Sequence, residues 1–351
     1  MNKMLLMLGV AAAAMTSCTS DEVVEMNPTN AIKFESFVNK GTRAVTDVYG
    51  PTNQTNPLKK FHVYGSRQTT ENGAQTNTNV WGGAMNTVSY DNGTWTNSKH
   101  EIWKDGTYSF VAYANGANAD AISSGVSYDE ATQTLTIENY TVDMDSEIDL
   151  IGAFAQAPDK YQAVDLTFKH LLTKVSFEFT NSYTAITGAT MNITGLKVIG
   201  AYSTGTCTLN YDNYSDISTD DASITMWETS GETPERLYDS DDDVRIVNGT
   251  GKYFDSHLFI PQALSDIKIS FTVTYYDGNN MIVSKDYSNV SLAGSIKDSS
   301  EDLTNWLPGF HYKYTAYLPV DPNEIVFSVT AVDGWAEREV DDDEPEVDVE
   351  Y

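Results

Sequence analysis

The sequence predicts an all-β protein made of antiparallel β-sandwiches, and three observations support this fold class. Segment after segment alternates apolar and polar residues with a period of two and is rich in Val, Ile, Thr, Tyr and Phe, as half-buried strands are. Turn-forming pairs such as Asp277 and Gly278 separate these segments. Helical periodicity is scarce. Short strands at this spacing are typical of sandwiches.

The chain begins with a predicted export signal. Lys3 precedes an apolar run over residues 4–15, which is followed by Thr16, Ser17 and Cys18. The run is shorter than the roughly 20 residues that a membrane-spanning helix needs. The pattern indicates a bacterial lipoprotein signal, with residues 1–17 removed, lipid on Cys18 and a lipidated linker over residues 18–30. An ordinary secretory signal with an incidental cysteine is the alternative.

The composition agrees with a protein outside the cytoplasm. There are 21 basic and 50 acidic residues, and the formal net charge is −29. This charge disfavours nucleic acid and anionic membrane surfaces as partners, so membrane contact is expected only through the lipid anchor. Cys207 is the only other cysteine, so a lipidated Cys18 leaves no intramolecular disulfide. The fold must then be stabilised by its hydrophobic core, and no cofactor is expected.

Several predicted strands follow one another along the chain. Each of them has the period-two pattern described above, and they lie at residues 61–64, 108–113, 133–137, 164–168, 174–179, 268–276 and 324–332. The polar residues 211–243 are predicted to form extended surface loops.

One hairpin is predicted in detail. Residues 268–276 place Ile269, Phe271, Val273 and Tyr275 on one face, and residues 277–280 turn the chain into a partner strand that begins at residue 281. A second sheet must cover this apolar face.

A domain boundary is predicted near the middle of the chain. One alternating block ends at residue 168, and the next begins at residue 171, with Lys169 and His170 at the junction. The sequence therefore predicts one domain over residues 31–168, a second over residues 169–335 and an acidic tail over residues 336–351.

Several segments in order along the chain resemble a known family. They are residues 32–34, 41–44, 103, 108–113, 164–168, 170–175, 258–262, 306–309, 312–314 and 332–335. Together with the lipoprotein signal, they are similar to the fimbrillin family of Bacteroidales, which includes the FimA-like and Mfa-like fimbrial subunits.

The resemblance implies two transthyretin-like antiparallel β-sandwich domains in tandem. It also implies export to the outer membrane as a lipoprotein, proteolytic processing between Arg43 and Ala44, and incorporation into a fimbrium. Removal of the first strand, with Ile32, Phe34, Phe37 and Val38, would open an apolar groove for a strand from another fimbrial subunit.

Such strand exchange is physically sound. A sandwich that loses an edge strand exposes unpaired backbone groups and empty side-chain pockets until another strand replaces it. The loop over residues 39–49 is polar and contains glycine, which favours access by a protease. The alternative is a permanent first strand and an ordinary loop arginine at position 43.

The acidic C-terminus departs from the expected pattern of a donor strand. Residues 337–351 carry nine acidic residues, and only residues 347–351 alternate at period two. Repulsion between like charges and Pro345 oppose strand pairing, so a solvated tail is the main expectation. A tail that cannot donate a strand favours a tip, accessory or anchor subunit over a repeating stalk subunit.

Little in the sequence supports catalysis, and we expect no enzyme activity. The five histidines have no metal-ligand spacing, and no nucleophile motif occurs. Two acidic clusters have the residue type that calcium prefers but lack an EF-hand pattern. They are Asp239, Asp241 and Asp243, and Asp143, Asp145, Glu147 and Asp149. Solvated surface charge is the main expectation for both.

Aromatic residues are the remaining candidates for ligand binding. The chain has 21 tyrosines and 6 tryptophans, and Tyr202, Tyr211, Tyr214 and Trp227 lie in or near the polar region. Exposed rings stack on sugars or proteins, whereas packed rings stabilise sheets. The sequence therefore predicts a fimbrial subunit or fimbria-associated adhesin, with a monomeric surface lipoprotein that binds a glycan or a protein as the alternative.

Overall fold

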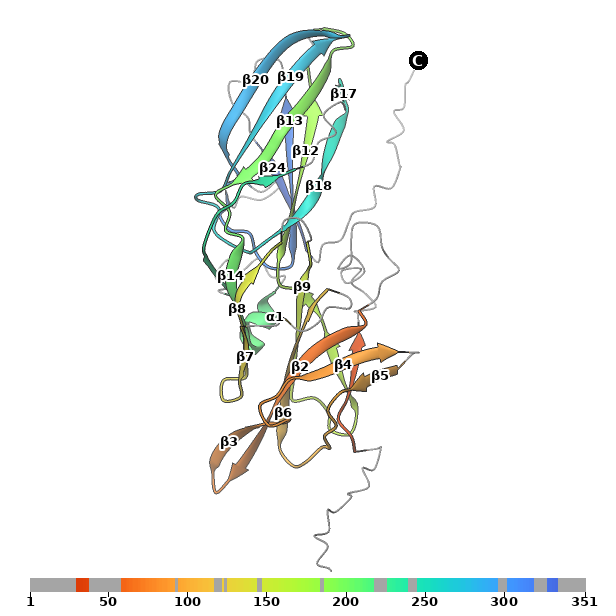
Figure 1. Ribbon diagram of the computed structural model, residues 1–351, viewed down its shortest axis with the longest axis vertical. Helices are drawn as coiled ribbons and strands as arrows, with labels where there is room; N and C mark the ends of the chain where they lie inside the picture. Colours follow the sequence, from red (N-terminus) through yellow and green to blue (C-terminus); the bar gives the residue numbers. More distant parts are fainter. Residues whose placement is uncertain are drawn as a thin grey trace, which may run out of the picture.

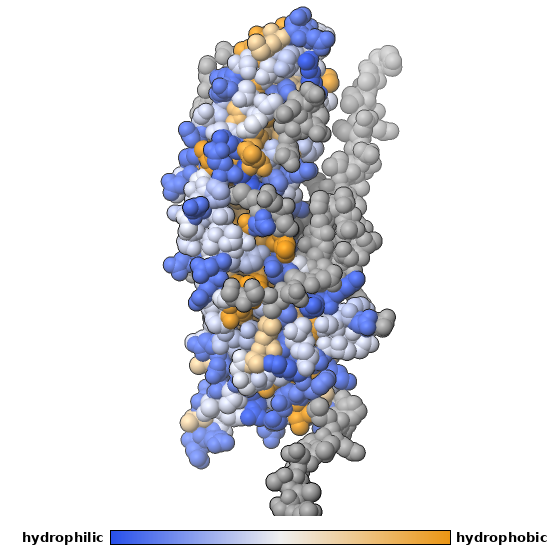
Figure 2. All heavy atoms as spheres, viewed as in Figure 1, coloured by the Kyte–Doolittle hydropathy of each residue, from blue (hydrophilic) through white to orange (hydrophobic). Residues whose placement is uncertain are grey.

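The structure is nearly all β, as predicted. It is a computed structural model that describes residues 30–37, 58–91, 94–116, 122, 125–143, 147–183, 186–217, 226–238, 245–295, 302–318 and 327–333. Within these residues, α1 (Tyr211–Asp216) is the only α-helix, and no helix is long and apolar enough to cross a membrane. The strands form an elongated stack of sheets (Figure 1). One face of the molecule is mostly hydrophilic with small separate apolar patches (Figure 2).

The first half of the chain is organised around a seven-stranded sheet of order β11-β9-β6-β2-β4-β5, with β3 paired to β2. Its strands are β2 (Lys60–Glu71), β3 (Ala74–Asn79), β4 (Asn86–Asp91), β5 (Thr94–Asn97), β6 (Thr107–Asn115), β9 (Leu150–Gln156) and β11 (Lys169–His170). A two-stranded sheet of β1 (Lys33–Phe37) and β10 (Ala163–Thr167) shares one core with this sheet. This core, which we call the first-strand core, includes Phe34, Phe61 and Phe110.

A third layer covers the opposite face of the seven-stranded sheet. It is a four-stranded sheet of order β15-β14-β8-β7. Its strands are β7 (Val126–Asp129), β8 (Thr134–Thr141), β14 (Thr204–Leu209) and β15 (Trp227–Ser230). The sheet combines strands from both sides of the predicted boundary at residue 168, and it packs on Val111 and Tyr113 of β6. The division into domains at this residue stays a prediction.

The second half of the chain forms a sandwich around the largest core. One sheet has the order β18-β12-β23-β24, and the other has the order β16-β13-β19-β20 with β17 paired to β13. Their strands are β12 (Thr173–Asn181), β13 (Thr190–Ile199), β16 (Arg236–Leu237), β17 (Ile246–Val247), β18 (Gly251–Phe259), β19 (Lys268–Asp277), β20 (Asn280–Ser291), β23 (Phe310–Leu318) and β24 (Ser328–Asp333). A short pair, β21 (Gly294–Ser295) and β22 (Asp302–Leu303), lies beside them.

The detailed hairpin is confirmed. Strands β19 and β20 pair antiparallel through a tight turn in which Gly278 has a φ of 56°, a left-handed conformation that glycine adopts without steric cost. The four apolar side chains predicted to share one face, at positions 269, 271, 273 and 275, are all buried in the core of this sandwich.

Two features differ from the simplest expectation. Most ladders are antiparallel, but β1 pairs with β10, and β12 with β23, in parallel. The prediction of loops over residues 211–243 is wrong in part, because this region contains α1 and the short strands β15 and β16. The N-terminus of α1 is capped by Asn210 in a reciprocal capping box with Asn213. The Lys169 ammonium group donates to the backbone oxygens of Tyr214 and Ile217 at the C-terminal end of α1. Capping at both ends therefore stabilises a short helix in a segment whose polar composition predicted a loop.

His311 gives the fold a pH dependence that can be measured. Burial, together with the charges of Lys174 and Lys313, lowers the pKa of His311 from 6.5 to about 3. Below pH 6.5 the unfolded chain binds a proton at His311 that the folded chain does not, so the contribution of His311 lowers the free energy of unfolding by at most about 1.4 kcal/mol per pH unit. We expect His311→Gln to remove this contribution when urea unfolding is compared between about pH 7 and about pH 5. An unchanged slope in the variant would contradict the assignment.

Candidate functional site

The candidate functional site is β1 together with the groove that its segment fills. By the groove we mean the part of the first-strand core that the side chains of Ile32 and Phe34 occupy. Within the described residues, β1 forms a ladder with only one strand, β10, in which Phe34 lies opposite Val164. The segment before β1 is held by two backbone hydrogen bonds of 2.9 Å, from the Ile32 N–H to the Glu101 oxygen and from the Trp103 N–H to the Asn30 oxygen. The strand is therefore attached along one edge and at its N-terminal end.

The side chains of this segment fill the groove. Ile32 is 1% exposed and Phe34 is 2% exposed. The Phe34 ring packs edge-on against Phe110 and Phe61, with centroid distances of 5.2 and 6.3 Å. A tilted contact with Trp81 at 6.1 Å completes its aromatic surroundings. Burial of each side chain contributes about 1.5–3 kcal/mol, so the first-strand core depends on both.

The floor of the groove is shaped to admit the Phe110 ring. Gly65 lies directly opposite Phe110 in the β2–β6 ladder. A Cβ atom at position 65 would lie 2.7 Å from the Phe110 ring, closer than atoms can pack. The absence of a side chain here leaves room for the ring against which Phe34 packs.

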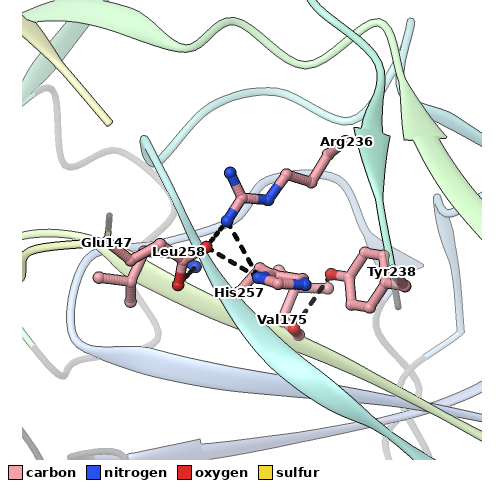
Figure 3. A network of polar contacts seen from close by, with 6 residues as sticks. All are labelled: Glu147, Val175, Arg236, Tyr238, His257 and Leu258. Carbon is pink, nitrogen blue, oxygen red and sulfur yellow. Dashed lines mark hydrogen bonds and ion pairs between the residues drawn. The ribbon is translucent and has the colours of Figure 1, made fainter. Parts of the chain in front are cut away.

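A partly buried polar network lies elsewhere and joins residues from the two halves of the chain (Figure 3). Glu147, just before β9, forms an ion pair with Arg236 of β16 and accepts a hydrogen bond from the Leu258 N–H. His257 of β18 lies close to both charged groups, with its Nδ1 atom 2.8 Å from Glu147 Oε1 and 3.0 Å from Arg236 Nη2. The Tyr238 hydroxyl donates to the Val175 oxygen beside it. No sequence motif indicates this network, because its members are distant in the chain.

The aromatic residues near the polar region divide into packed and exposed rings. The Trp227 indole N–H donates to the Leu171 oxygen at 2.7 Å, and the Tyr214 hydroxyl donates to the Thr167 oxygen at 2.6 Å. Tyr202 is 38% exposed and Tyr211 is 45% exposed. Packing therefore explains Trp227 and Tyr214, whereas the other two rings reach the surface.

The comparisons with known proteins agree with the fold. Residues 42–335 match the fimbrillin-like family. The chain belongs to this family. A fimbrial protein from Bacteroides vulgatus has a similar fold, with a TM-score of 0.55 at 16% identity over 87% of this chain and 99% of that chain. A comparison with curated proteins finds no match.

Two further solved structures are similar at lower scores. A fimbrial assembly protein from Parabacteroides distasonis has a TM-score of 0.38 at 14% identity, over 86% of this chain and 98% of that chain. A tip fimbrial protein from Porphyromonas gingivalis has a TM-score of 0.39 at 10% identity, over 79% of this chain and 94% of that chain.

The predicted site residues of this fimbrillin-like protein are only partly within the described residues. Ile32 and Phe34 lie in the groove, and Phe37 is the last residue of β1. The other predicted residues, Cys18, Val38, Arg43 and Ala44, lie outside the described part of the chain.

The acidic cluster at residues 143–149 is divided between separate contacts in the fimbrillin-like fold. Asp149 is buried and lies 2.6 Å from His170 Nδ1, whereas Glu147 belongs to the polar network. The described residues contain no group of three or more side chains suited to a metal ion. Asp145 and the cluster at residues 239–243 lie outside the described residues.

Proposed function

We propose that this fimbrillin-like protein is a cell-surface fimbrial subunit, or a fimbria-associated tip or accessory adhesin, that assembles with other fimbrial subunits by β-strand exchange. The observation that carries the proposal is the contrast within β1. Its segment supplies two deeply buried side chains, Ile32 and Phe34, yet among the strands that the structure describes β1 forms a ladder with β10 alone. A strand of this kind contributes strongly to the core and has few backbone bonds to break.

The proposed route begins with export and lipidation at Cys18, which anchors the protein at the outer membrane. Cleavage between Arg43 and Ala44 then separates β1 from the rest of the chain. After cleavage, β1 is held by non-covalent contacts alone, because the peptide chain that joined it to the rest of the protein is cut. The lipid leaves with β1, so the anchor serves delivery, and the processed protein enters the fimbrium.

A strand from another subunit would restore what β1 provided. Its backbone would pair with β10, and apolar side chains two residues apart would occupy the positions of Ile32 and Phe34. Once β1 has left, the edge of β10 is unpaired and the aromatic groove is exposed, and both favour this replacement.

The first experiment is digestion of the full chain with an arginine-specific protease. We expect removal of the segment ending at Arg43, followed by a ladder of oligomers that dissociate on heating. Both should be visible by electrophoresis of unheated and heated samples. Arg43→Gln is the matched control, which should resist this cleavage and stay monomeric. A processed chain that remains monomeric would contradict strand exchange.

A monomeric surface lipoprotein that keeps β1 and binds a glycan or a protein is the second candidate. It is favoured by the exposed rings of Tyr202 and Tyr211, because such rings combine a flat apolar face with a polar hydroxyl. The same digestion separates the candidates, since this one requires an uncut or non-assembling chain.

A further inference from the structure

Two exposed tyrosines lie on the outer face of one sheet in the second half of the chain. The sheet has the order β18-β12-β23-β24, and its inner face, which includes Phe179 of β12, packs in the largest core. Because side chains alternate between the two faces of a strand, Glu178 and Thr180 point outward. Tyr253 of β18 lies directly opposite Glu178, and Tyr317 of β23 lies directly opposite Thr180, so both rings share this outer face. Tyr253 is 58% exposed and Tyr317 is 64% exposed.

A polar strip separates the two tyrosines. Strands lie about 4.8 Å apart and rise about 3.3 Å per residue, so the Cα atoms of the tyrosines, two strands and two residues apart, are separated by about 12 Å. Glu178, Thr180 and Thr315 line the strip, because Thr315 lies opposite Glu178 in the ladder of β12 and β23. Gly251 lies opposite Thr180, and a Cβ atom there would lie 2.8 Å from Glu178 Oε1, so the glycine keeps the carboxylate uncrowded. We call the strip and its two flanking rings the tyrosine face.

The charges of the tyrosine face are largely balanced. Lys313 Nζ lies 2.7 Å from Glu178 Oε2 and 4.0 Å from the centre of the Tyr253 ring. The ammonium group therefore holds both the carboxylate and the ring in place, which lowers the conformational entropy that a ligand must overcome. Asp255, exposed two residues further along β18, adds a negative charge to this neutral pair. Together with the formal net charge of −29, it disfavours an acidic ligand.

This arrangement fits a neutral sugar. A hexopyranose ring presents C–H groups that pack on an aromatic ring, and its hydroxyl groups form hydrogen bonds with carboxylate, hydroxyl and ammonium groups. The tyrosine face offers both kinds of partner side by side. A stable protein–protein interface has an apolar centre, whereas the centre of this face is polar. The chemistry therefore favours a glycan over a docked protein.

We propose that the tyrosine face binds a neutral hexose glycan, with Tyr253 and Tyr317 stacked on sugar rings and Glu178 accepting hydrogen bonds from sugar hydroxyls. The face lies in the half of the molecule away from β2 and β6, whose side chains line the first-strand groove (Figure 1). Binding therefore needs neither cleavage at Arg43 nor strand exchange.

The test is saturation-transfer difference NMR of the uncleaved chain with mannotriose, lactose and cellotriose. Irradiation of the aromatic protons of the protein should transfer magnetisation to the C–H protons of at least one sugar, and titration gives the dissociation constant. We expect Tyr253→Ala and Tyr317→Ala each to weaken binding about tenfold, because each removes a stacking ring. Tyr317→Phe keeps the ring and should bind like the unchanged chain.

Tyr161→Ala is the matched control for Tyr317→Ala. Tyr161 is 52% exposed and lies between β9 and β10 in the first half of the chain, so the same truncation should leave sugar binding unchanged. Urea unfolding should be the same for the control and for both tyrosine-face variants, because all three side chains are exposed. A loss of binding then reports on contact with the sugar.

Four outcomes would overturn the proposal. None of the three sugars binds, or Tyr161→Ala weakens binding as much as Tyr317→Ala. Sialyllactose, which carries a carboxylate, binds as tightly as lactose. Line broadening that grows with protein concentration and disappears in Tyr317→Ala, without sugar binding, would assign the face to a second copy of the chain. Because every measurement uses the uncleaved chain, a failure here is distinct from a failure of strand exchange.

Discussion

Replacement of Phe34 by alanine is expected to lower the free energy of unfolding by about 3–5 kcal/mol. The side chain is 2% exposed and contacts the rings of Phe61, Trp81 and Phe110, so its removal leaves a cavity lined by aromatic rings. Urea unfolding measures the loss. Amide hydrogen exchange gives a readout specific to β1, because the Ile32 N–H, bonded to the Glu101 oxygen, should exchange faster in the variant.

Lys33→Ala is the matched control for Phe34→Ala. Lys33 is exposed on the same strand, so its replacement should change the free energy of unfolding by no more than about 0.5 kcal/mol. If the two variants behave alike, β1 contributes little to the core. The groove would then not need refilling after the loss of β1, which would also weaken the case for strand exchange.

Replacement of Glu147 by glutamine is expected to lower the free energy of unfolding by about 3–5 kcal/mol. The Arg236 side chain is 4% exposed, and loss of the partner carboxylate leaves its charge buried without an ion pair to Glu147. The same change removes an acceptor of the Leu258 N–H and the neighbour of the His257 ring. Urea unfolding again measures the effect.

An exposed ion pair whose glutamate precedes Arg236 in the chain provides the comparison for Glu147→Gln. Lys197 and Glu235 lie 2.8 Å apart, with side chains 31% and 58% exposed. Solvent screens such a pair, so Glu235→Gln should cost no more than about 1 kcal/mol. Equal losses in the two glutamine variants would mean that burial does not set the strength of the Glu147–Arg236 contact.

The sequence predicts the strands well where the alternation and the turn that joins two paired strands lie close together in the chain. The hairpin of β19 and β20 is the clearest case, because alternation, turn residues and a short connection all act within a few residues of one another. Strand β6 is different. The alternation read from its sequence accounts for one buried face, whereas both faces are covered, by the first-strand core and by the sheet that contains β8 and β14.

The candidate site was predicted only in part, for a related reason. The family resemblance places Ile32 and Phe34 in the first strand, and both side chains are buried there. The sequence marks Glu147 only as a member of an acidic cluster, and its partner Arg236 carries no signal at all. Their importance depends on partners from other strands.

The sequence by itself determined the all-β class, the membership of the fimbrillin-like family and the positions of the principal strands and turns. These follow from local alternation, from turn chemistry and from the order of short motifs along the chain. Only the tertiary structure decided that β1 pairs in parallel with β10, that strands from both halves share one sheet, and that Glu147 meets Arg236 across them. The physical reason is that pairing and burial depend on contacts between residues far apart in the chain, whose energies no local pattern encodes.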